Sequence, residues 1–277
     1  MDKQVKFQPV IKWSGSKRSL SKEIINYFPK NIKTYFEPFA GGCSVLFQLI
    51  NSDINVDKYI CSDTNVELIE FFNLVKEDPL QIYNEYKCRW EALKSRESIE
   101  EKKDYYYFIR NRFNTHHDVH DFVFLTRTAV NGLIRYNSKG EFNSSFHLTR
   151  DGIKPDSLKE ILMTWSEVLK KSNVEFVCCD YREITPQEGD FVFLDPPYIN
   201  TKGMYHGGID YEELWNWMSR LKCNYALTFD GKTGSADHTY NVPCNLYSKH
   251  IYLDSKISGF RKLKSKKEYV SESLYLK

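Results

Sequence analysis

The stretch Phe191-Val192-Phe193-Leu194-Asp195-Pro196-Pro197-Tyr198 decides which fold and chemistry we expect. Its four apolar residues predict a short buried strand, because aromatic and β-branched side chains favour strands. Two consecutive prolines then end that strand, since they fix φ and lack N–H donors for a sheet. A rigid loop therefore begins at the strand's carboxyl end, with the carboxylate of Asp195 and the carbonyl of Pro196 directed outward.

The ring of Tyr198 follows these two oxygen acceptors in the sequence. An exocyclic amine offers two N–H donors beside a flat π system, so two acceptors and an aromatic ring complement an extruded adenine or cytosine. The simpler interpretation is a strand-ending turn, because Asp and Pro are common turn residues. The tetrapeptide alone does not establish a site, and the other motifs of the chain decide between the two interpretations.

The composition sets bounds on the class of protein. A chain of 277 residues can form one large α/β domain, with or without an insertion. Because 39 Lys and Arg oppose 37 Asp and Glu, any affinity for nucleic acid has to come from local clusters. The 7 cysteines include no Cys-x-x-Cys pair, and there is no secretory leader, so we expect reduced thiols in the cytoplasm. Without an apolar run of about 18 residues, we expect no membrane span.

A glycine turn follows the first expected strand. Residues 33–37 predict a short strand, and Pro38-Phe39-Ala40-Gly41-Gly42 leads into a helix that begins at Val45. Strand, glycine turn and helix N-terminus together allow close backbone approach by a nucleotide-like ligand. Upstream, the Ser-Gly-Ser turn between Trp13 and Lys17 is either a surface loop or an anion-binding loop that uses the lysine.

Asp63 ends a second expected strand, over residues 59–63. It stands 22 residues beyond Gly41, which suits an acid that accepts hydrogen bonds from ribose hydroxyls. The alternative is a helix N-cap, since a helix is expected from Thr64 and Asn65 through Val75. Both roles can fall to neighbouring residues.

The middle of the chain is helical and charged. Apolar residues recur at three- and four-residue spacing, and we expect an insertion at 79–173 in a sheet domain formed by 1–78 and 174–277. Near its end, turn residues and aromatics over Asn131–Asn143 predict a hairpin that exposes Arg135. One arginine can grip guanine O6 and N7 bidentately, although a solvated surface cation is the common case. The three nearby histidines lack a partnered Cys or acid, so we expect no metal site.

The last third alternates strands with helix and loop. We expect strands at 174–179, 225–229, 246–253 and 269–276, and a helix at 210–221. The glycine-containing segment 201–208 could close over a bound base. Residues 255–267 contain no acid, and their cations are either a solvated turn or phosphate contacts: Lys256, Arg261, Lys262, Lys264, Lys266 and Lys267.

Five motifs stand in an order that resembles the Dam-type adenine-N6 DNA methyltransferases (D12 class, alpha group). They are Lys12-Trp-x-Gly-x-Lys17, Glu37-Pro-Phe-x-Gly41, Cys61-Ser-Asp-Thr-Asn65, Asn131-Gly-Leu-x-Arg-Tyr-Asn-x-x-Gly-x-Phe-Asn143 and Asp195-Pro-Pro-Tyr198. The match spans almost the whole chain. The resemblance implies an α/β fold, a Rossmann-like S-adenosylmethionine-dependent methyltransferase sheet with an inserted, mainly helical target-recognition domain that carries a β-hairpin.

The resemblance also implies a role for particular residues. Lys17 is expected near the methionine carboxylate of the cofactor and Asp63 at its ribose. The full set of implied cofactor contacts is Trp13, Lys17, Glu37, Phe39, Gly41, Asp63, Asp180, Tyr181 and Asp195. The implied catalytic residues are Asp195, Pro196, Pro197 and Tyr198. The implied DNA contacts are Asn131, Leu133, Arg135, Asn137, Lys139, Arg261, Lys262 and Lys264.

The resemblance implies transfer of a methyl group from S-adenosylmethionine to N6 of a flipped adenine in a short double-stranded DNA sequence, without a metal. GATC or another GAT-containing site is the expected target. The expected enzyme is a cytoplasmic monomer of a prokaryote or phage, with a cognate restriction endonuclease as a partner to look for. The alternatives are a cytosine-N4 methyltransferase, which usually resembles Ser-Pro-Pro-Tyr, and a non-catalytic DNA-binding module that binds the cofactor.

Three positions depart from the family's pattern. Cys43 stands where many relatives have glycine, which puts the detail of cofactor approach in doubt. On the recognition hairpin, Ser145 replaces a proline that is common in GATC readers, and Val130 replaces a frequent aromatic residue. These residues therefore do not specify the identity of the outer base pairs in the target sequence.

Overall fold

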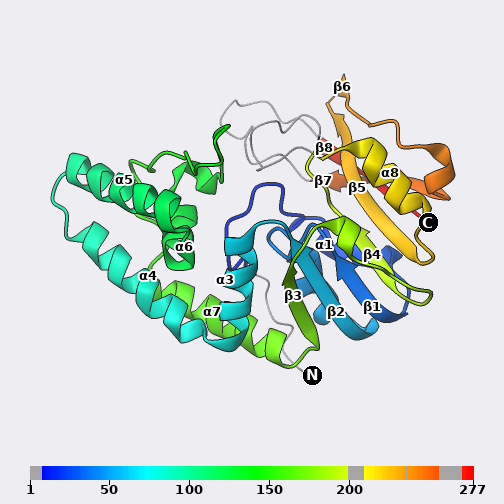
Figure 1. Ribbon diagram of the computed structural model, residues 1–277, viewed down its shortest axis with the longest axis horizontal. Coiled ribbons are helices and arrows are strands. Elements are labelled where there is room, and N and C mark those ends of the chain that lie inside the picture. Colours follow the sequence, from blue (N-terminus) through cyan, green and yellow to red (C-terminus); the bar gives the residue numbers. More distant parts are fainter. Residues whose placement is uncertain (1–7, 199–208, 235, 256–269) are drawn as a thin grey trace.

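The computed structural model describes residues 8–198, 209–234, 236–255 and 270–277 (Figure 1). The described strands form one sheet in the order β3-β2-β1-β4-β5-β8-β7, with β6 paired to β5. Strands β1 to β5 are parallel, and β8 runs antiparallel between β5 and β7. This doubly wound order confirms the expected α/β fold class. The strands are β1 (Asn31–Glu37), β2 (Asn55–Asp63), β3 (Val174–Cys178), β4 (Phe191–Leu194), β5 (Asn224–Thr233), β6 (Ala236–Asp237), β7 (Lys249–Ser255) and β8 (Val270–Leu276).

Strand β4 is central and covered on both faces, as its four apolar residues predicted. Phe191 and Phe193 pack into the hydrophobic cluster on one face, and Val192 and Leu194 pack into the cluster on the other. This division follows from the two-residue period of a strand. The Phe28 ring lies 4.5 Å from that of Phe191, between centroids. The strand thus anchors the loop that begins at Asp195.

Helices cover both faces of the sheet and extend beyond it. Helices α1 to α3 belong to the larger cluster, and α8 covers the opposite face. The helices are α1 (Ser21–Ile24), α2 (Ser44–Ile50), α3 (Val66–Glu77), α4 (Pro79–Lys94), α5 (Ile99–His116), α6 (Val119–Thr128), α7 (Pro155–Lys170) and α8 (Tyr211–Ser219). Short 3-10 turns are η1 (Ile25–Tyr27), η2 (Val130–Gly132), η3 (Tyr181–Glu183) and η5 (Cys244–Leu246).

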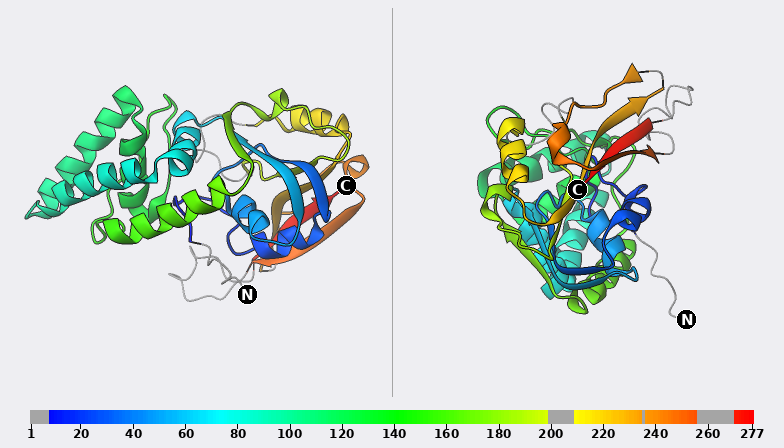
Figure 2. Two further views of the ribbon diagram at one scale, coloured as in Figure 1. Left: turned by 90° about the horizontal axis from the view of Figure 1, so that it is seen from below. Right: turned by 90° about the vertical axis from the view of Figure 1, so that its right-hand side faces the viewer.

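Helices α4 to α7 lie together beside the sheet (Figure 1 and the left view of Figure 2). Within this group, Asp121 of α6 is fully buried, and its carboxylate accepts hydrogen bonds from Arg89 of α4 and Arg112 of α5. Helix α7 packs against both α4 and α3, and its Trp165 ring lies 4.7 Å from that of Phe47. The helical character of this segment agrees with the sequence analysis, and the boundaries at 78 and 174 stay a prediction.

The loop after α6 has two antiparallel arms that pair at isolated bridges, Ala129 with Phe146 and Tyr136 with Phe142. One arm is held to α5 by side chains instead of a regular ladder. Asn114 accepts from the Phe142 N–H at 2.8 Å and donates to its carbonyl at 3.1 Å. The Tyr106 hydroxyl donates to the Ser144 carbonyl at 3.0 Å. The predicted hairpin is therefore present in outline, with α5 as its support.

The described residues contain neither a membrane-spanning helix nor a metal-binding cluster. Among them, none of the helices has the length and apolar character needed to span a bilayer. In the same part of the chain, no group of three or more His, Cys, Asp or Glu side chains is arranged to hold a metal ion.

Candidate active site

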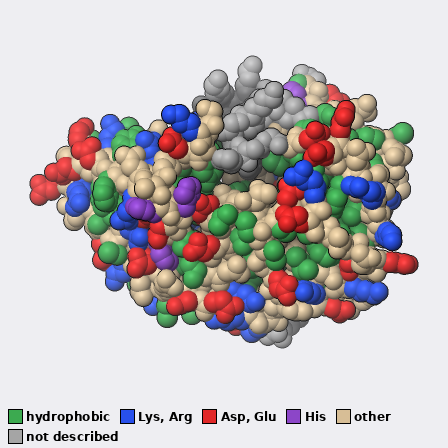
Figure 3. Space-filling model, viewed as in Figure 1, with side chains coloured by type: hydrophobic (Ala, Val, Ile, Leu, Met, Phe, Trp, Pro, Cys, Tyr) green, Lys and Arg blue, Asp and Glu red, His purple; other side chains and the backbone are tan. Residues whose placement is uncertain are grey.

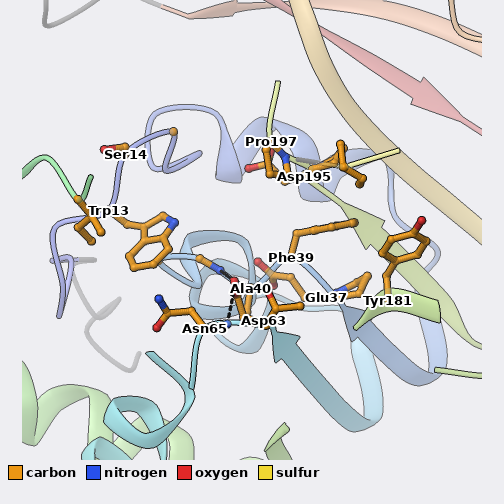
Figure 4. Close-up of a pocket in the computed structure, with 18 of the residues that line it drawn as sticks. Trp13, Ser14, Glu37, Phe39, Ala40, Asp63, Asn65, Tyr181, Asp195 and Pro197 are labelled. Atoms are coloured by element: carbon orange, nitrogen blue, oxygen red, sulfur yellow. Dashed lines mark hydrogen bonds between the residues drawn. The ribbon is translucent and has the colours of Figure 1, made fainter. Parts of the chain in front are cut away.

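A cavity of about 620 Å³ opens at the carboxyl ends of β1, β2 and β4 (Figure 4). Its volume falls within the usual range for small-molecule sites. The lining brings together every catalytic and cofactor candidate from the sequence: Trp13, Lys17, Glu37, Phe39, Gly41, Asp63, Asp180, Tyr181, Asp195, Pro196, Pro197 and Tyr198. On the face shown in Figure 3, Lys and Arg side chains are interspersed with Asp and Glu.

The glycine turn after β1 forms the floor of the cavity against Trp13. Gly41 has a φ of +46°, and a Cβ there would lie 2.8 Å from Trp13 Nε1. Only glycine combines a positive φ with so close an approach of the Trp13 ring without strain. Cys43 also takes a left-handed φ, of 50°, just before α2 begins, and burial raises the pKa of its thiol well above the usual value. The unusual cysteine therefore sits beneath the turn as a buried, neutral side chain.

Asp63 is tied to the same turn. One oxygen accepts from the Gly41 N–H at 3.1 Å, and the other accepts from the Asn65 N–H at 3.0 Å. The N-cap of α3 is Asn65, whose side chain accepts from Leu68 N–H at 2.7 Å. Each carboxylate oxygen of Asp63 has a second lone pair for a ligand hydroxyl. The N-cap role therefore falls to Asn65 and not to Asp63, whose carboxylate binds the glycine turn and has its pKa raised by burial.

Aromatic rings line the far side of the cavity (Figure 4). The Phe39 and Tyr181 rings lie 5.5 Å apart, and Tyr181 packs edge-on against Trp217 at 5.4 Å. Asp180 caps the short turn η3 and pairs with Arg182 Nε at 2.7 Å. Because Asp180 caps the turn that contains Tyr181, its carboxylate helps to hold the Tyr181 ring in position.

Glu37 ends β1 with a carboxyl group that is 3% exposed. It accepts a hydrogen bond from the Tyr35 hydroxyl at 2.8 Å. Burial raises the pKa of Glu37 to about 8, and the nearby charge of Asp195 acts in the same direction. A largely neutral carboxyl group therefore lies at the boundary between β1 and β4.

The carboxylate of Asp195 is held by two donors on one oxygen. Lys17 Nζ lies 2.8 Å from Oδ1, and the Thr228 hydroxyl donates to the same atom at 2.8 Å. Lys17 is 4% exposed and also donates to the Gly15 carbonyl at 3.0 Å. Burial raises the pKa of Asp195, while Lys17 opposes that rise. The lysine thus partners the loop acid in this structure.

Tyr198 is fixed on three sides. Its ring stacks on that of Phe229 with centroids 5.5 Å apart, Lys17 Nζ lies 4.7 Å from its centroid, and its hydroxyl donates to Glu272 Oε2 at 3.0 Å. The Tyr211 hydroxyl donates to the carbonyl of Pro197. These contacts hold both the ring and the loop backbone in place.

Sequence reasoning missed Thr228, Tyr211 and Glu272. Thr228 lay inside the expected strand at 225–229, and the pairing of Leu194 with Leu227 on β4 and β5 brings it beside Asp195. Glu272 is an isolated acid in a strand near the end of the chain, a pattern without a functional signal. Its place depends on strand order, which the local sequence does not encode.

The loop candidates for DNA contact differ in their exposure. Asn131, Arg135 and Lys139 are exposed, whereas the side chain of Leu133 is 9% exposed. The Asn137 side chain is occupied within the turn, where it donates to Glu141 Oε2 at 2.7 Å. The remaining candidates, Arg261, Lys262 and Lys264, and the segment 201–208 lie outside the described residues.

One contact joins this loop to the start of α3, and a second joins the C-cap of α5 to the same helix. The Asn65 side chain donates to the Tyr136 hydroxyl at 3.3 Å, and His117 Nδ1 lies 2.6 Å from Glu67 Oε1. All four of these residues line the cavity, as does Gly140. The ends of α3 and the loop after α6 therefore share one wall.

The sequence matches the family described as D12 class N6 adenine-specific DNA methyltransferase over residues 13–268. The chain belongs to this family. The D12 methyltransferase is 35% identical over 208 residues to the type II methyltransferase M.MjaIII of Methanocaldococcus jannaschii, covering 69% of each chain. It is 32% identical over 202 residues to a DNA adenine methylase of Haemophilus influenzae, covering 70% of this chain and 65% of that one.

A third relative of the D12 methyltransferase is the type II methyltransferase M1.LlaDCHI of Lactococcus lactis subsp. cremoris. The two are 29% identical over 226 residues, which is 76% of this chain and 74% of the relative. The family description specifies N6 of adenine and DNA. It therefore decides between the adenine and cytosine alternatives in favour of adenine, as Asp195 indicated.

Proposed function

We propose that this chain transfers a methyl group from S-adenosylmethionine to N6 of an adenine turned out of double-stranded DNA, with Asp195 and the carbonyl of Pro196 as acceptors for the amine. The anchoring of Asp195 carries the proposal. Lys17 pairs with Oδ1 and the Thr228 hydroxyl donates a hydrogen bond to the same atom, whereas none of the described residues donates a hydrogen bond to Oδ2. A carboxylate fixed in this way presents its second oxygen to a donor in the cavity.

The cavity residues fit S-adenosylmethionine in size and chemistry. Gly41 lets the Trp13 ring lie directly against the glycine turn, because a Cβ there would overlap the indole, and together they form the floor on which a ligand would rest. Asp63 offers lone pairs for ribose hydroxyls, and the Phe39 and Tyr181 rings, which pack on each other, offer an aromatic surface for an adenine. A cationic ammonium beside Glu37 would favour the ionised form of this carboxyl group, which is largely neutral in the free protein. When bound, the cofactor supplies an electrophilic methyl group on a sulfonium.

The other proposed cofactor residues form the rest of this lining. Trp13 covers the glycine turn, and Asp180 positions Tyr181 at the aromatic surface for the adenine. Lys17 already faces three acceptors, Gly15, Asp195 and Glu272, which matches the three N–H donors of an ammonium. We therefore assign Lys17 first to Asp195, and contact with the cofactor's carboxylate would require it to exchange one partner.

The target amine needs hydrogen-bond acceptors because its lone pair is delocalised into the purine ring. Asp195 Oδ2 and the Pro196 carbonyl accept hydrogen bonds from the two N–H groups of this amine. They stabilise the positive charge that grows on the nitrogen as it bonds to the methyl group. Pro197 keeps the loop rigid, and Tyr198 stacks on the extruded base. This stacking offsets part of the unstacking cost of a few kcal/mol.

The segment 79–173 is the proposed target-recognition domain, inserted between 1–78 and 174–277. Asn131, Arg135 and Lys139 are its exposed candidates for DNA contact, and Arg135 is the proposed guanine reader in a GAT-containing site. The buried Leu133 and the occupied Asn137 are proposed to shape the reading loop. We also propose that DNA phosphates are contacted by Arg261, Lys262 and Lys264.

Two wider proposals rest on relatives. Those described as type II methyltransferases suggest a restriction–modification role with a cognate endonuclease. We also propose that the enzyme works as a cytoplasmic monomer that methylates one strand at a time.

One experiment tests both the activity and the target. Purified protein and S-adenosylmethionine are incubated with unmodified genomic DNA, and N6-methyladenine is mapped by single-molecule sequencing. We expect one enriched motif with a GAT core. Asp195→Ala should abolish methylation while DNA binding persists, and Asp57→Ala, at an exposed position on β2, is the matched control. An absence of N6-methyladenine from protein that binds the cofactor would refute the proposed function, and a motif without GAT would refute the proposed target.

A further inference from the structure

Glu272 approaches the catalytic loop from the far end of the sequence. It lies on β8, opposite Asp230 of β5, and its side chain is 22% exposed. The pairing of β5 with β8 shifts register between Asp230 and Thr233. Here a Cβ on Gly231 would overlap the Ser271 carbonyl and lie 3.0 Å from the Glu272 Cα. Glycine at this position therefore lets β8 approach closely where it carries the acid.

The carboxylate of Glu272 contacts Lys17, which is one of the two partners of Asp195, and Tyr198 of the catalytic loop. Its Oε2 accepts from the Tyr198 hydroxyl at 3.0 Å and lies 3.3 Å from Lys17 Nζ. Lys17 in turn lies 2.8 Å from Asp195 Oδ1. One ammonium is thus shared by two carboxylates, and the side chain that stacks on the base is bonded to the second of them.

The second carboxylate changes the charge of the cluster. Lys17 and Asp195 alone would form a neutral pair, whereas the addition of Glu272 leaves one net negative charge. An amine that accepts a methyl group becomes positively charged, so a fixed negative charge nearby stabilises the transition state more than the ground state. The Tyr198 hydroxyl is neutral and contributes orientation only.

We propose that Glu272 is a positioning residue for methyl transfer: it holds Lys17 and Tyr198 in place around Asp195 and supplies the negative charge that the Lys17–Asp195 pair lacks. This inference rests on the proposed function. Glu272 acts through its two neighbours and is not assigned any contact with the base or the cofactor. Its predicted signature is a loss in the rate of the chemical step, with binding preserved.

Two substitutions separate charge from hydrogen bonding. Glu272→Gln keeps the size and an acceptor for Tyr198 but removes the charge, and Glu272→Asp keeps the charge on a shorter side chain. We expect Glu272→Gln to lower the single-turnover methylation rate by about 10- to 100-fold. The dissociation constant for S-adenosylhomocysteine, measured by calorimetry, should not change. Glu272→Asp should recover part of the lost rate.

The acid limb of the pH–rate profile is a further measurement. It should shift if Glu272 acts through its charge and should not shift if Glu272 only supports the fold. Among the described residues, the titratable groups around Asp195 are Lys17, Glu37, Tyr198 and Glu272. The charge of Glu272 raises the pKa of Asp195. Its removal should therefore shift the acid limb of Glu272→Gln to lower pH, and Glu272→Asp should restore the wild-type limb.

Base extrusion is followed separately, by the fluorescence of 2-aminopurine at the target position of a duplex. Glu272→Gln should keep the signal, because Tyr198 retains an acceptor, and Glu272→Ala should reduce it. Asp254→Asn, at an exposed position on β7, is the matched control and should behave as wild type in every assay.

The outcomes distinguish the two proposals. An active wild-type enzyme whose rate and pH profile are unchanged in Glu272→Gln would overturn the role of Glu272 and leave the proposed function standing. Loss of cofactor binding in folded Glu272→Gln would also overturn it, since the effect would then be structural. A wild-type protein that binds the cofactor and forms no N6-methyladenine would overturn the proposed function and this inference together.

Discussion

Replacing Glu37 with glutamine should stabilise the free protein, and the gain should grow with pH. The carboxyl is buried against Tyr35, and its pKa rises from an ordinary value of 4.5 to about 8. A folded-state pKa above the unfolded value means that the folded chain holds a proton that the unfolded chain has released. The contribution of Glu37 to the free energy of unfolding is therefore fully present below pH 4.5 and is lost as the pH rises through about 8.

The size of the effect follows from this pKa. Each pH unit between the two values lowers the free energy of unfolding by about 1.4 kcal/mol, with the loss levelling off above the folded-state pKa. Between about pH 6 and pH 8, the wild type should lose roughly 2 kcal/mol through Glu37. Glutamine resembles the protonated carboxyl and keeps an acceptor for the Tyr35 hydroxyl, so Glu37→Gln should lose nothing through this site.

Urea unfolding, followed by tryptophan fluorescence at a series of pH values without cofactor, measures the difference. The gap in the free energy of unfolding between Glu37→Gln and wild type should widen with pH and then level off. Glu160→Gln, at an exposed position on α7, makes the same change in charge and should show a constant gap. A gap for Glu37→Gln that does not change with pH would refute the reasoning.

Three further substitutions test other parts of the structure. Gly41→Ala should weaken binding of S-adenosylhomocysteine in calorimetry by at least about tenfold, because the new Cβ would meet Trp13 Nε1 at 2.8 Å on a backbone with positive φ. Asn114→Ala should lower the free energy of unfolding by about 1 to 3 kcal/mol, since it leaves the backbone groups of Phe142 without their partner. Arg135→Ala should relax the motif found by methylation mapping while cofactor affinity is retained, at a cost of about 1 to 3 kcal/mol of base discrimination.

The sequence predicted the parts of the site that depend on short stretches. The strand at 191–194 and the turn at Gly41 follow from local periodicity and glycine chemistry, and the parallel sheet brings their carboxyl ends to one edge. The contacts of Lys17 could not be predicted in the same way. The sequence suggested either a surface loop or an anion-binding loop that uses Lys17, whereas the fold buries the lysine between two carboxylates of the protein itself, Asp195 and Glu272.

The recognition loop shows a different limit. Its turn residues predicted a hairpin, but propensity does not reveal that Asn114 and Tyr106 of α5 replace part of the strand pairing. The two residues from Phe142 to Ser144 span about 6.6 Å along a strand, whereas the step from Tyr106 to Asn114, just over two turns of α5, spans about 12 Å, so the match depends on how the elements cross. Such crossing angles are a property of packing, which single-sequence patterns do not contain.

The strand order explains why the two sets of candidates meet. The chain runs from β1 outward to β2 and β3, and later from β4 outward to β5, so the order reverses between β1 and β4. Ligands of doubly wound sheets bind at such a switch point, because the connections leave it in opposite directions. Most residues proposed for the cofactor follow β1, β2 or β3, and those proposed for the base follow β4, where Thr228 of β5 and Glu272 of β8 support them through Asp195, Lys17 and Tyr198. Glu37 and Asp195 end the two strands at this boundary, so a methyl group passing between the two ligands has to cross there.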